Sequence, residues 1–271
     1  MNLPRQKTSL GDRLRRLGIV GQTPRVSVDP VSIDTAIPGG EVCNRHGTFL
    51  LRKKRFDRTH RHGRLGLGGA LDLAPHLPGH AGRLSGYAGV PATRRLYLDT
   101  ETTSLGSGAG VKVFLIGAGF FTDDGFVVHQ YLMRHPGEER AMLLGLRDLL
   151  TNFDALVTFH GRSFDCPRMN DRFLFQDLSC DLTLPLHLDL HHAARRLFGH
   201  RFEHCRLQVF ERELLGFHRA DDLPGSACPE AWFEYQRGHS NRLPDVLRHN
   251  LDDILSLVVL EQRVGAAFTT P

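Results

Sequence analysis

Three features are missing from this sequence. Its five cysteines are scattered, odd in number and never spaced as CxxC, which argues against a disulfide framework or a thiolate zinc site. No apolar run approaches the roughly 20 residues that span a bilayer. The first residues, MNLPRQKTSLGDRLRR, lack the apolar core of a secretory signal. We therefore expect reduced thiols, no membrane partner and a cytoplasmic location.

Charge is unevenly distributed along the 271 residues. Residues 1–95 hold 17 of the 34 Lys and Arg and 6 of the 30 Asp and Glu, a balance of +11. Residues 96–271 hold 17 against 24, a balance of −7. A basic segment favours a polyanionic partner, which an acidic body repels unless cations bind to it. The combination indicates a nucleic-acid partner and a divalent metal bound by the acidic body. The alternative is that the basic segment is a solvated leader without a binding role.

We divide the chain into a basic N-terminal extension, residues 1–93, and a main domain, residues 94–265. The extension is expected to be partly disordered, because it is rich in Pro, Gly and charge. Its expected segments are a helix at 5–18, a linker at 19–42, a strand at 47–51 and a helix at 70–77.

In the main domain, the sequence pattern predicts three strands, a helix, a fourth strand and then mostly helices. Tight turns make the first three strands antiparallel, and the strand after the helix pairs in parallel with the first. A segment near 180–190 is a candidate fifth strand. We predict an α/β fold, a mixed five-stranded sheet flanked by helices. The expected strands are 94–105, 111–121, 126–133 and 155–160, and the expected helices include 138–153, 191–199, 206–216 and 243–264.

Acidic residues follow the predicted strands at two places and recur on the last helix. Asp99 and Glu101 are two apart at the end of the first strand and so share a face. Asp165 lies at the start of a helix after the fourth strand, where an acid alone only offsets the helix dipole. His249 and Asp253 are four apart on the final helix, which an ordinary surface pair also explains.

The case for a site comes from these positions together. Because the first and fourth strands are adjacent in the predicted sheet, Asp99, Glu101 and Asp165 converge, and a helix across that edge adds Asp253. Such carboxylates repel one another unless cations neutralise them, and hard oxygen ligands select Mg²⁺ or Mn²⁺, about two per site.

Three sequence blocks carry a family resemblance. LDTETT, FHGRSFDCP and HNLDDILSL resemble the motifs of the DEDD (DnaQ-like) superfamily of 3′–5′ exonucleases. HLDLHHAARRLFG, CRLQVFERELLG and DDLPGSACPEAWFEYQRG look like one bacterial branch, the YprB-like RNase H-like domain proteins. The resemblance covers roughly residues 45–262 and implies an RNase H-like fold.

By this resemblance the chain is a metal-dependent 3′–5′ exonuclease that hydrolyses single-stranded DNA or RNA by a two-metal mechanism. Asp99, Glu101, Asp165 and Asp253 match the metal ligands, and His249 matches the Tyr or His position. The spacing of four is that of the tyrosine type, whereas the residue is histidine. His249 is therefore either the general base or a residue that orients water or phosphate.

Basic residues supply a candidate nucleic-acid surface. Arg52, Lys53, Lys54 and Arg55 form a run able to follow a phosphate backbone, and a solvated edge is the alternative. Arg162 and Arg168 flank Asp165 and are placed to meet the scissile phosphate. Two other functions stay open, a catalytically weak RNase H-like nucleic-acid-binding module and a hydrolase of small phosphate substrates.

Overall fold

The computed structural model describes residues 39–72, 89–106, 108, 110–183, 186–239 and 242–269. The helix expected at 5–18 lies outside this part of the chain, as do nearly all of the expected linker and most of the helix expected at 70–77.

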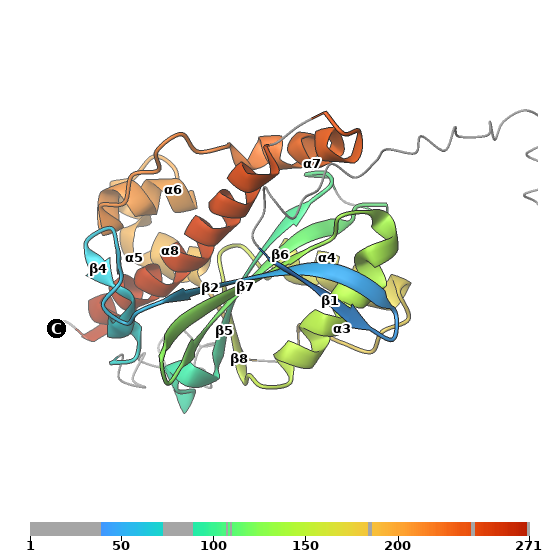
Figure 1. The fold of residues 1–271 in the computed structure, drawn as a ribbon. Coiled ribbons are helices and arrows are strands. Elements are labelled where there is room, and N and C mark those ends of the chain that lie inside the picture. Colours follow the sequence, from blue (N-terminus) through green and yellow to red (C-terminus); the bar gives the residue numbers. More distant parts are fainter. Residues whose placement is uncertain are drawn as a thin grey trace, which may run out of the picture. The chain divides into compact units, whose positions relative to one another are not determined.

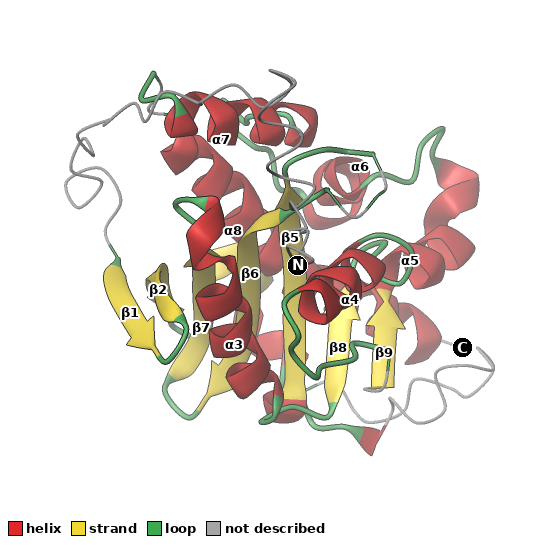
Figure 2. Ribbon diagram, turned by 90° about the vertical axis from the view of Figure 1, so that its right-hand side faces the viewer, coloured by secondary structure: helices red, strands yellow, loops and turns green. Residues whose placement is uncertain are grey.

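One mixed sheet organises the described residues, with strand order β1-β2-β7-β6-β5-β8-β9 (Figures 1 and 2). Its first five strands in that order pair antiparallel, and β8 and β9 continue from β5 in parallel. The strands are β1 (Gly40–Asn44), β2 (Gly47–Phe56), β5 (Arg95–Thr102), β6 (Val113–Thr122), β7 (Gly125–Leu132), β8 (Ala155–Thr158) and β9 (Leu186–Asp189). This arrangement confirms the predicted mixed α/β sheet, including the fifth strand near 180–190.

The sheet has seven strands rather than five, because the hairpin of β1 and β2 continues it beyond β7. That hairpin comes from the segment expected as an N-terminal extension, where only a strand at 47–51 was predicted. Gly125 shows why β2 fits there: its φ is +142°, and a Cβ atom would lie 2.3 Å from the Phe56 carbonyl oxygen. The tight turn before β7 thus leaves room for the end of β2 to approach.

Helices cover both faces of the sheet. In Figure 2, α3 (Glu139–Leu150) and α4 (Asp165–Phe175) lie in front of the strands and α8 (Leu243–Thr269) lies behind them. On the α8 side, α5 (Leu190–Phe198) packs against α8. The remaining helices are α6 (Leu207–Phe210), the π turn η6 (Glu211–Leu215) and α7 (Cys228–Gln236). Short 3-10 turns are η1 (Leu67–Ala70), η3 (Ala92–Arg94), η4 (Pro136–Glu138), η5 (Gly199–Arg201) and η7 (Gly225–Ala227).

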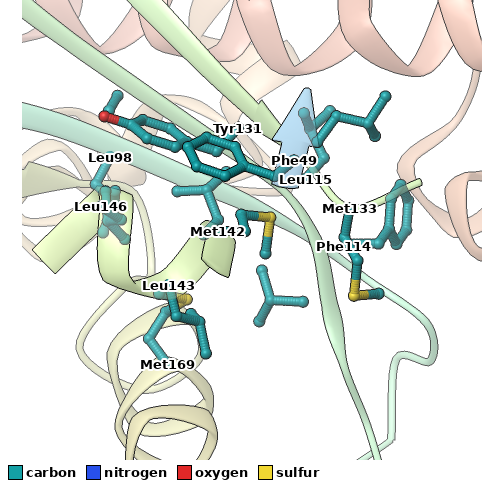
Figure 3. Close-up of a cluster of buried hydrophobic side chains, with 14 of the residues drawn as sticks. Phe49, Leu98, Phe114, Leu115, Tyr131, Met133, Met142, Leu143, Leu146 and Met169 are labelled. Carbon is teal, nitrogen blue, oxygen red and sulfur yellow. The ribbon is translucent and has the colours of Figure 1, made fainter. Parts of the chain in front are cut away.

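The core divides into two apolar clusters, one on each face. Met142, Leu143 and Leu146 of α3 are buried in the first cluster together with Phe49 of β2, and Figure 3 shows Leu143 beside Met169. Trp232 of α7 joins this cluster, and its Nε1 donates to the Met133 carbonyl oxygen at 3.0 Å. Apolar side chains of α5, α6 and α8 form the second cluster against the other face. Both faces of the sheet are therefore tightly packed around the strands that carry the site.

The basic segment after β2, residues 57–64, contributes a buried residue to the fold. His62 lies in the small hairpin β3 (Arg61–His62) and β4 (Leu65–Gly66) and is buried. Its Nε2 is 2.8 Å from Ser256 Oγ, and because that hydroxyl donates to Glu211, His62 is the donor. Its ring packs on Phe217. This histidine is therefore held neutral against α8.

Acid should weaken the fold through His62. Burial, followed by Arg219, lowers its pKa to about 3. The unfolded chain therefore binds the extra proton between that value and about 6.5, so stability falls as pH drops through this window, by about 2 kcal/mol at pH 5. In His62→Gln, the difference in unfolding free energy between pH 7 and pH 5, measured in urea, should shrink by that amount. An unchanged difference would contradict this assignment.

Candidate active site

Strand β5 presents two acids to helix α8. Asp99 and Glu101 alternate along the strand and share a face, as their spacing predicted. Asp99 is half-buried and Glu101 is 7% exposed. Asn250 of α8 donates from Nδ2 to Asp99 Oδ2 at 2.8 Å, so the helix fixes one oxygen of this carboxylate.

Helix α8 brings the third acid to the same place. Carboxylate oxygens of Asp99, Glu101 and Asp253 all lie within 4.8 Å of one another. His249 lies one turn before Asp253, and its Nε2 is 3.5 Å from Asp253 Oδ2. Residues about 150 positions apart in the chain therefore form one cluster, as the predicted strand and helix order favours.

Asp165 approaches from the first turn of α4 and is buried. Thr100 Oγ1, on the opposite face of β5 from Asp99, donates to Asp165 Oδ1 at 2.5 Å. The carboxylate of Asp165 is not within the 4.8 Å set, yet its charge raises the pKa of Asp99 and of Glu101. It therefore lies beside the three acids rather than among them.

Asp189 holds the loop that leads to Asp165. Its carboxylate accepts backbone N–H groups of His160 at 2.9 Å, Arg162 at 3.2 Å and His191 at 3.1 Å. It thereby joins the end of β8 to the start of α5, where it is the N-cap. In the sequence, Asp189 was recognisable only as part of the block HLDLHHAARRLFG, and its role was not predicted.

Three of the four acids have raised pKa values. Burial and then the charge of Asp253 raise the pKa of Asp99 well above its usual range. Burial likewise raises the pKa of Glu101 to about 8 and that of Asp165 to about 6. A cation would lower these pKa values, and an all-oxygen donor set suits Mg²⁺ or Mn²⁺. These buried acidic side chains could hold metal ions.

A buried arginine also faces the acids. Arg219, in the loop after η6, has a side chain only 6% exposed. Its guanidinium donates to Asp253 Oδ1, and to Glu211 at 2.8 and 2.5 Å. Neither residue was predicted: Arg219 lies outside the quoted sequence blocks, and Glu211 lies in CRLQVFERELLG but had no role assigned to it. Asp253 thus accepts from Arg219 through Oδ1, and its Oδ2 lies toward His249.

Asp222, from the same loop, sets the orientation of His249. Its Oδ1 is 2.9 Å from His249 Nδ1. A carboxylate only accepts, so Nδ1 carries the proton. Arg219 Nη1, 3.1 Å from the same nitrogen, then donates instead to Asp222 Oδ2 at 3.2 Å. In the neutral form of His249, Nε2 is therefore the nitrogen that accepts a proton. Burial lowers the pKa of His249, but the charges of Asp253 and Glu101 and the hydrogen bond to Asp222 outweigh burial and raise that pKa above its usual value.

A chain of side-chain hydrogen bonds connects Asp99, through Asn250 of α8 and Gln130 of β7, to Arg52 of β2. Asn250 Oδ1 accepts from Gln130 Nε2 at 3.0 Å, and Gln130 Oε1 accepts from Arg52 at 3.0 Å. Gly117, paired with Asp99, makes room, since a Cβ atom would lie 2.4 Å from Asn250 Oδ1. Arg52, predicted to bind nucleic acid, is thus half-buried and partnered within the protein.

The other predicted basic residues are not in one patch. Alternation along β2 places Lys54 on the face of Arg52, and places Lys53 and Arg55 on the other. Lys53 and Lys54 are exposed, whereas Arg55 pairs with Asp124 at 3.0 Å.

Arg162 and Arg168 flank Asp165 as expected, and both already have partners in the protein. Arg162 is exposed and donates to the His187 carbonyl oxygen at 2.6 Å. Arg168 lies over the Phe164 ring and donates to Gly106 O at 2.9 Å. Arg168 thereby connects the start of α4 to the loop after β5.

Among the described residues, no helix combines the length and apolar character required to cross a bilayer.

Comparison with known proteins gives three findings. Residues 96–264 match the model of the RNase_H superfamily. Over 217 residues the chain is 34% identical to Uncharacterized protein YprB of Bacillus subtilis (strain 168), covering 78% of this chain and 52% of that protein. The chain thus spans about half the length of this curated relative. It also resembles a solved structure of the family B DNA polymerase from the hyperthermophilic archaeon Pyrobaculum calidifontis, with a TM-score of 0.49 and 17% identity over 64% of this chain and 24% of the polymerase.

The family match begins in β5 and ends in α8, so it includes Asp99, Glu101, Asp165 and Asp253. It also covers more than half of the 271 residues. This chain belongs to the RNase_H superfamily and is a homologue of the Bacillus subtilis protein YprB.

Proposed function

We propose that this protein is a metal-dependent nuclease, a 3′–5′ exonuclease acting on single-stranded DNA or RNA. The observation that carries the proposal is the meeting of Asp99, Glu101 and Asp253 oxygens within 4.8 Å, with Asp165 beside them. The motif resemblance and the superfamily membership support phosphodiester hydrolysis as the chemistry. The acidic body and its basic N-terminal segment fit a polyanionic substrate that meets the protein through cations.

Two divalent cations, Mg²⁺ or Mn²⁺, held by Asp99, Glu101, Asp165 and Asp253, would supply a more acidic water and stabilise charge on the leaving 3′ oxygen. In this proposal, Nε2 of His249 accepts a proton from the attacking water. Asp222 keeps the proton of His249 on Nδ1. Asn250 orients Asp99, and Asp189 positions the loop that carries Asp165.

The test is a titration of Mg²⁺ and Mn²⁺ with single strands labelled at the 5′ end. We expect a ladder produced by stepwise loss of 3′ nucleotides, and no ladder from Asp99→Asn. Internal cleavage without a ladder would overturn the exonuclease assignment, and a complete lack of hydrolysis at any metal concentration would overturn the nuclease itself.

A second function has one observation in its favour. Arg219 already places a positive charge on Asp253, so part of the repulsion is relieved without metal. A catalytically weak RNase H-like nucleic-acid-binding module would show strand binding without turnover in the same titration.

The role of His249 is testable through Asp222. If Asp222 acts only by orienting His249, Asp222→Asn should lower kcat about tenfold or more in the unaltered background. In a His249→Ala background the same substitution should change kcat less than about twofold, because the two residues act as a unit. Equal effects in both backgrounds would show that Asp222 does not act through His249.

Nucleic-acid binding by the β2 run is a separate proposal. Lys53 and Lys54 are exposed, whereas Arg52 and Arg55 have partners within the protein. We therefore expect Lys53→Gln/Lys54→Gln to reduce the slope of log affinity against log salt by about 1 to 2. Arg55→Gln is the matched control, with a smaller expected change. A slope unaltered by the double substitution would remove β2 from the binding surface.

A further inference from the structure

Cys228 is a buried thiol inside the candidate active site, and the proposed hydrolysis does not use it. It is the first residue of α7 and is 0% exposed. Its Sγ lies within 4.8 Å of a Glu101 carboxylate oxygen and donates to the Pro224 carbonyl oxygen at 4.0 Å. The cysteine count and spacing alone suggested only scattered, buried thiols, so this contact comes from the tertiary structure.

Three different donor types meet at this thiol. Ligating atoms of Glu101, Cys228 and His249 lie within 4.8 Å of one another, and they come from β5, α7 and α8. All three residues are buried. A sulfur, an imidazole nitrogen and a carboxylate oxygen together form a set that Zn²⁺ prefers and that Mg²⁺ does not.

The environment of His249 supplies an independent observation. Its Nδ1 donates to Asp222, so Nε2 is the nitrogen available to a ligand. A histidine that binds metal through one nitrogen commonly donates the other N–H to a carboxylate, which fixes the ring and raises its basicity. Asp253 Oδ2 lies 3.5 Å from Nε2, but Asp253 belongs to the set of converging carboxylates and not to the set that contains Cys228.

We propose that Glu101, Cys228 and His249 form a second cation site, selective for Zn²⁺ and chemically similar ions, that shares Glu101 with the all-oxygen site. Zn²⁺ binds the sulfur as a thiolate and releases the thiol proton to solvent, whereas hard cations leave the thiol protonated.

The consequence for activity rests on the proposed function. Zn²⁺ in this site withdraws Glu101 from the Mg²⁺ or Mn²⁺ ligands and occupies the nitrogen of His249 that would accept a proton. Zn²⁺ therefore inhibits the Mn²⁺-dependent reaction, and Mn²⁺ competes with it only through Glu101.

The site is tested with the full chain and no nucleic acid, using Co²⁺ as a spectroscopic substitute for Zn²⁺. Co²⁺ should give a near-ultraviolet sulfur-to-metal charge-transfer band that one equivalent of Zn²⁺ removes. The band should be absent in Cys228→Ser and present in Cys43→Ser, a control at an exposed thiol. Zn²⁺ should bind Cys228→Ser at least about tenfold more weakly, since a Zn²⁺ ligand is lost.

Lack of the charge-transfer band in the unaltered chain, or its persistence in Cys228→Ser, would overturn the site. The charge-transfer band is first measured in the unsubstituted protein, so a folding defect in the variant cannot explain its absence there. Failure of the proposed function would appear separately, as a lack of Mn²⁺-dependent hydrolysis in zinc-free buffer.

Discussion

Asp99→Asn is expected to reduce Mn²⁺-dependent hydrolysis at least about a thousandfold, on the order of 4 kcal/mol of transition-state stabilisation. The same substitution should raise the melting temperature of the metal-free protein. Burial and three neighbouring acids make the ionised form of Asp99 costly, as its raised pKa shows. Asparagine removes that charge and retains an oxygen able to accept from Asn250. Activity and thermal denaturation in buffer with chelator measure the two effects.

Asp252→Asn is the matched control for this substitution. Asp252 precedes Asp253 on α8 but is not in the set of converging carboxylates. Its substitution should leave hydrolysis within a few-fold of the unaltered rate. If metal-free Asp99→Asn had a melting temperature several degrees below that of the unaltered protein, the carboxylates would not repel one another as inferred, whatever the activity of the variant.

Arg219→Met should destabilise the fold by about 3–5 kcal/mol, because it leaves buried Glu211 without its partner. The two Arg219–Glu211 hydrogen bonds and the contact with Asp253 are all made by a side chain that is 6% exposed. In a chain of this size, the loss corresponds to a melting temperature lower by roughly 10 °C. Urea unfolding of the metal-free protein is the direct measurement.

Two further variants test whether the loss of stability comes from the broken Arg219–Glu211 pair or from any arginine-to-methionine substitution. Arg219→Met/Glu211→Met should recover much of the loss, because a buried pair replaced by apolar residues is often close to neutral. Arg248→Met breaks a half-exposed pair with Asp245 and should cost less than about 1 kcal/mol. If Arg219→Met were as mild as Arg248→Met, the pairing of Arg219 with Glu211 would be energetically unimportant.

Much of the fold followed from local patterns. Short apolar runs predicted β5, β6, β7 and β8, and a helical stripe of apolar residues within 138–153 predicted α3. The helix expected at 206–216 is present, as the short α6 that continues into the π turn η6. The hairpin of β1 and β2 was missed, because its attachment to β7 depends on a partner more than 70 residues away.

The sequence by itself determined which site residues share a face. Residues two apart point to the same side of a strand, and residues four apart lie on the same side of a helix. It thereby placed Asp99 with Glu101 and His249 with Asp253. Only the tertiary structure decided which residues surround them. Arg219, Asp222 and Cys228 come from a loop and a short helix whose positions follow no period. Their contacts exist because packing across the sheet brings that loop against α8 and β5.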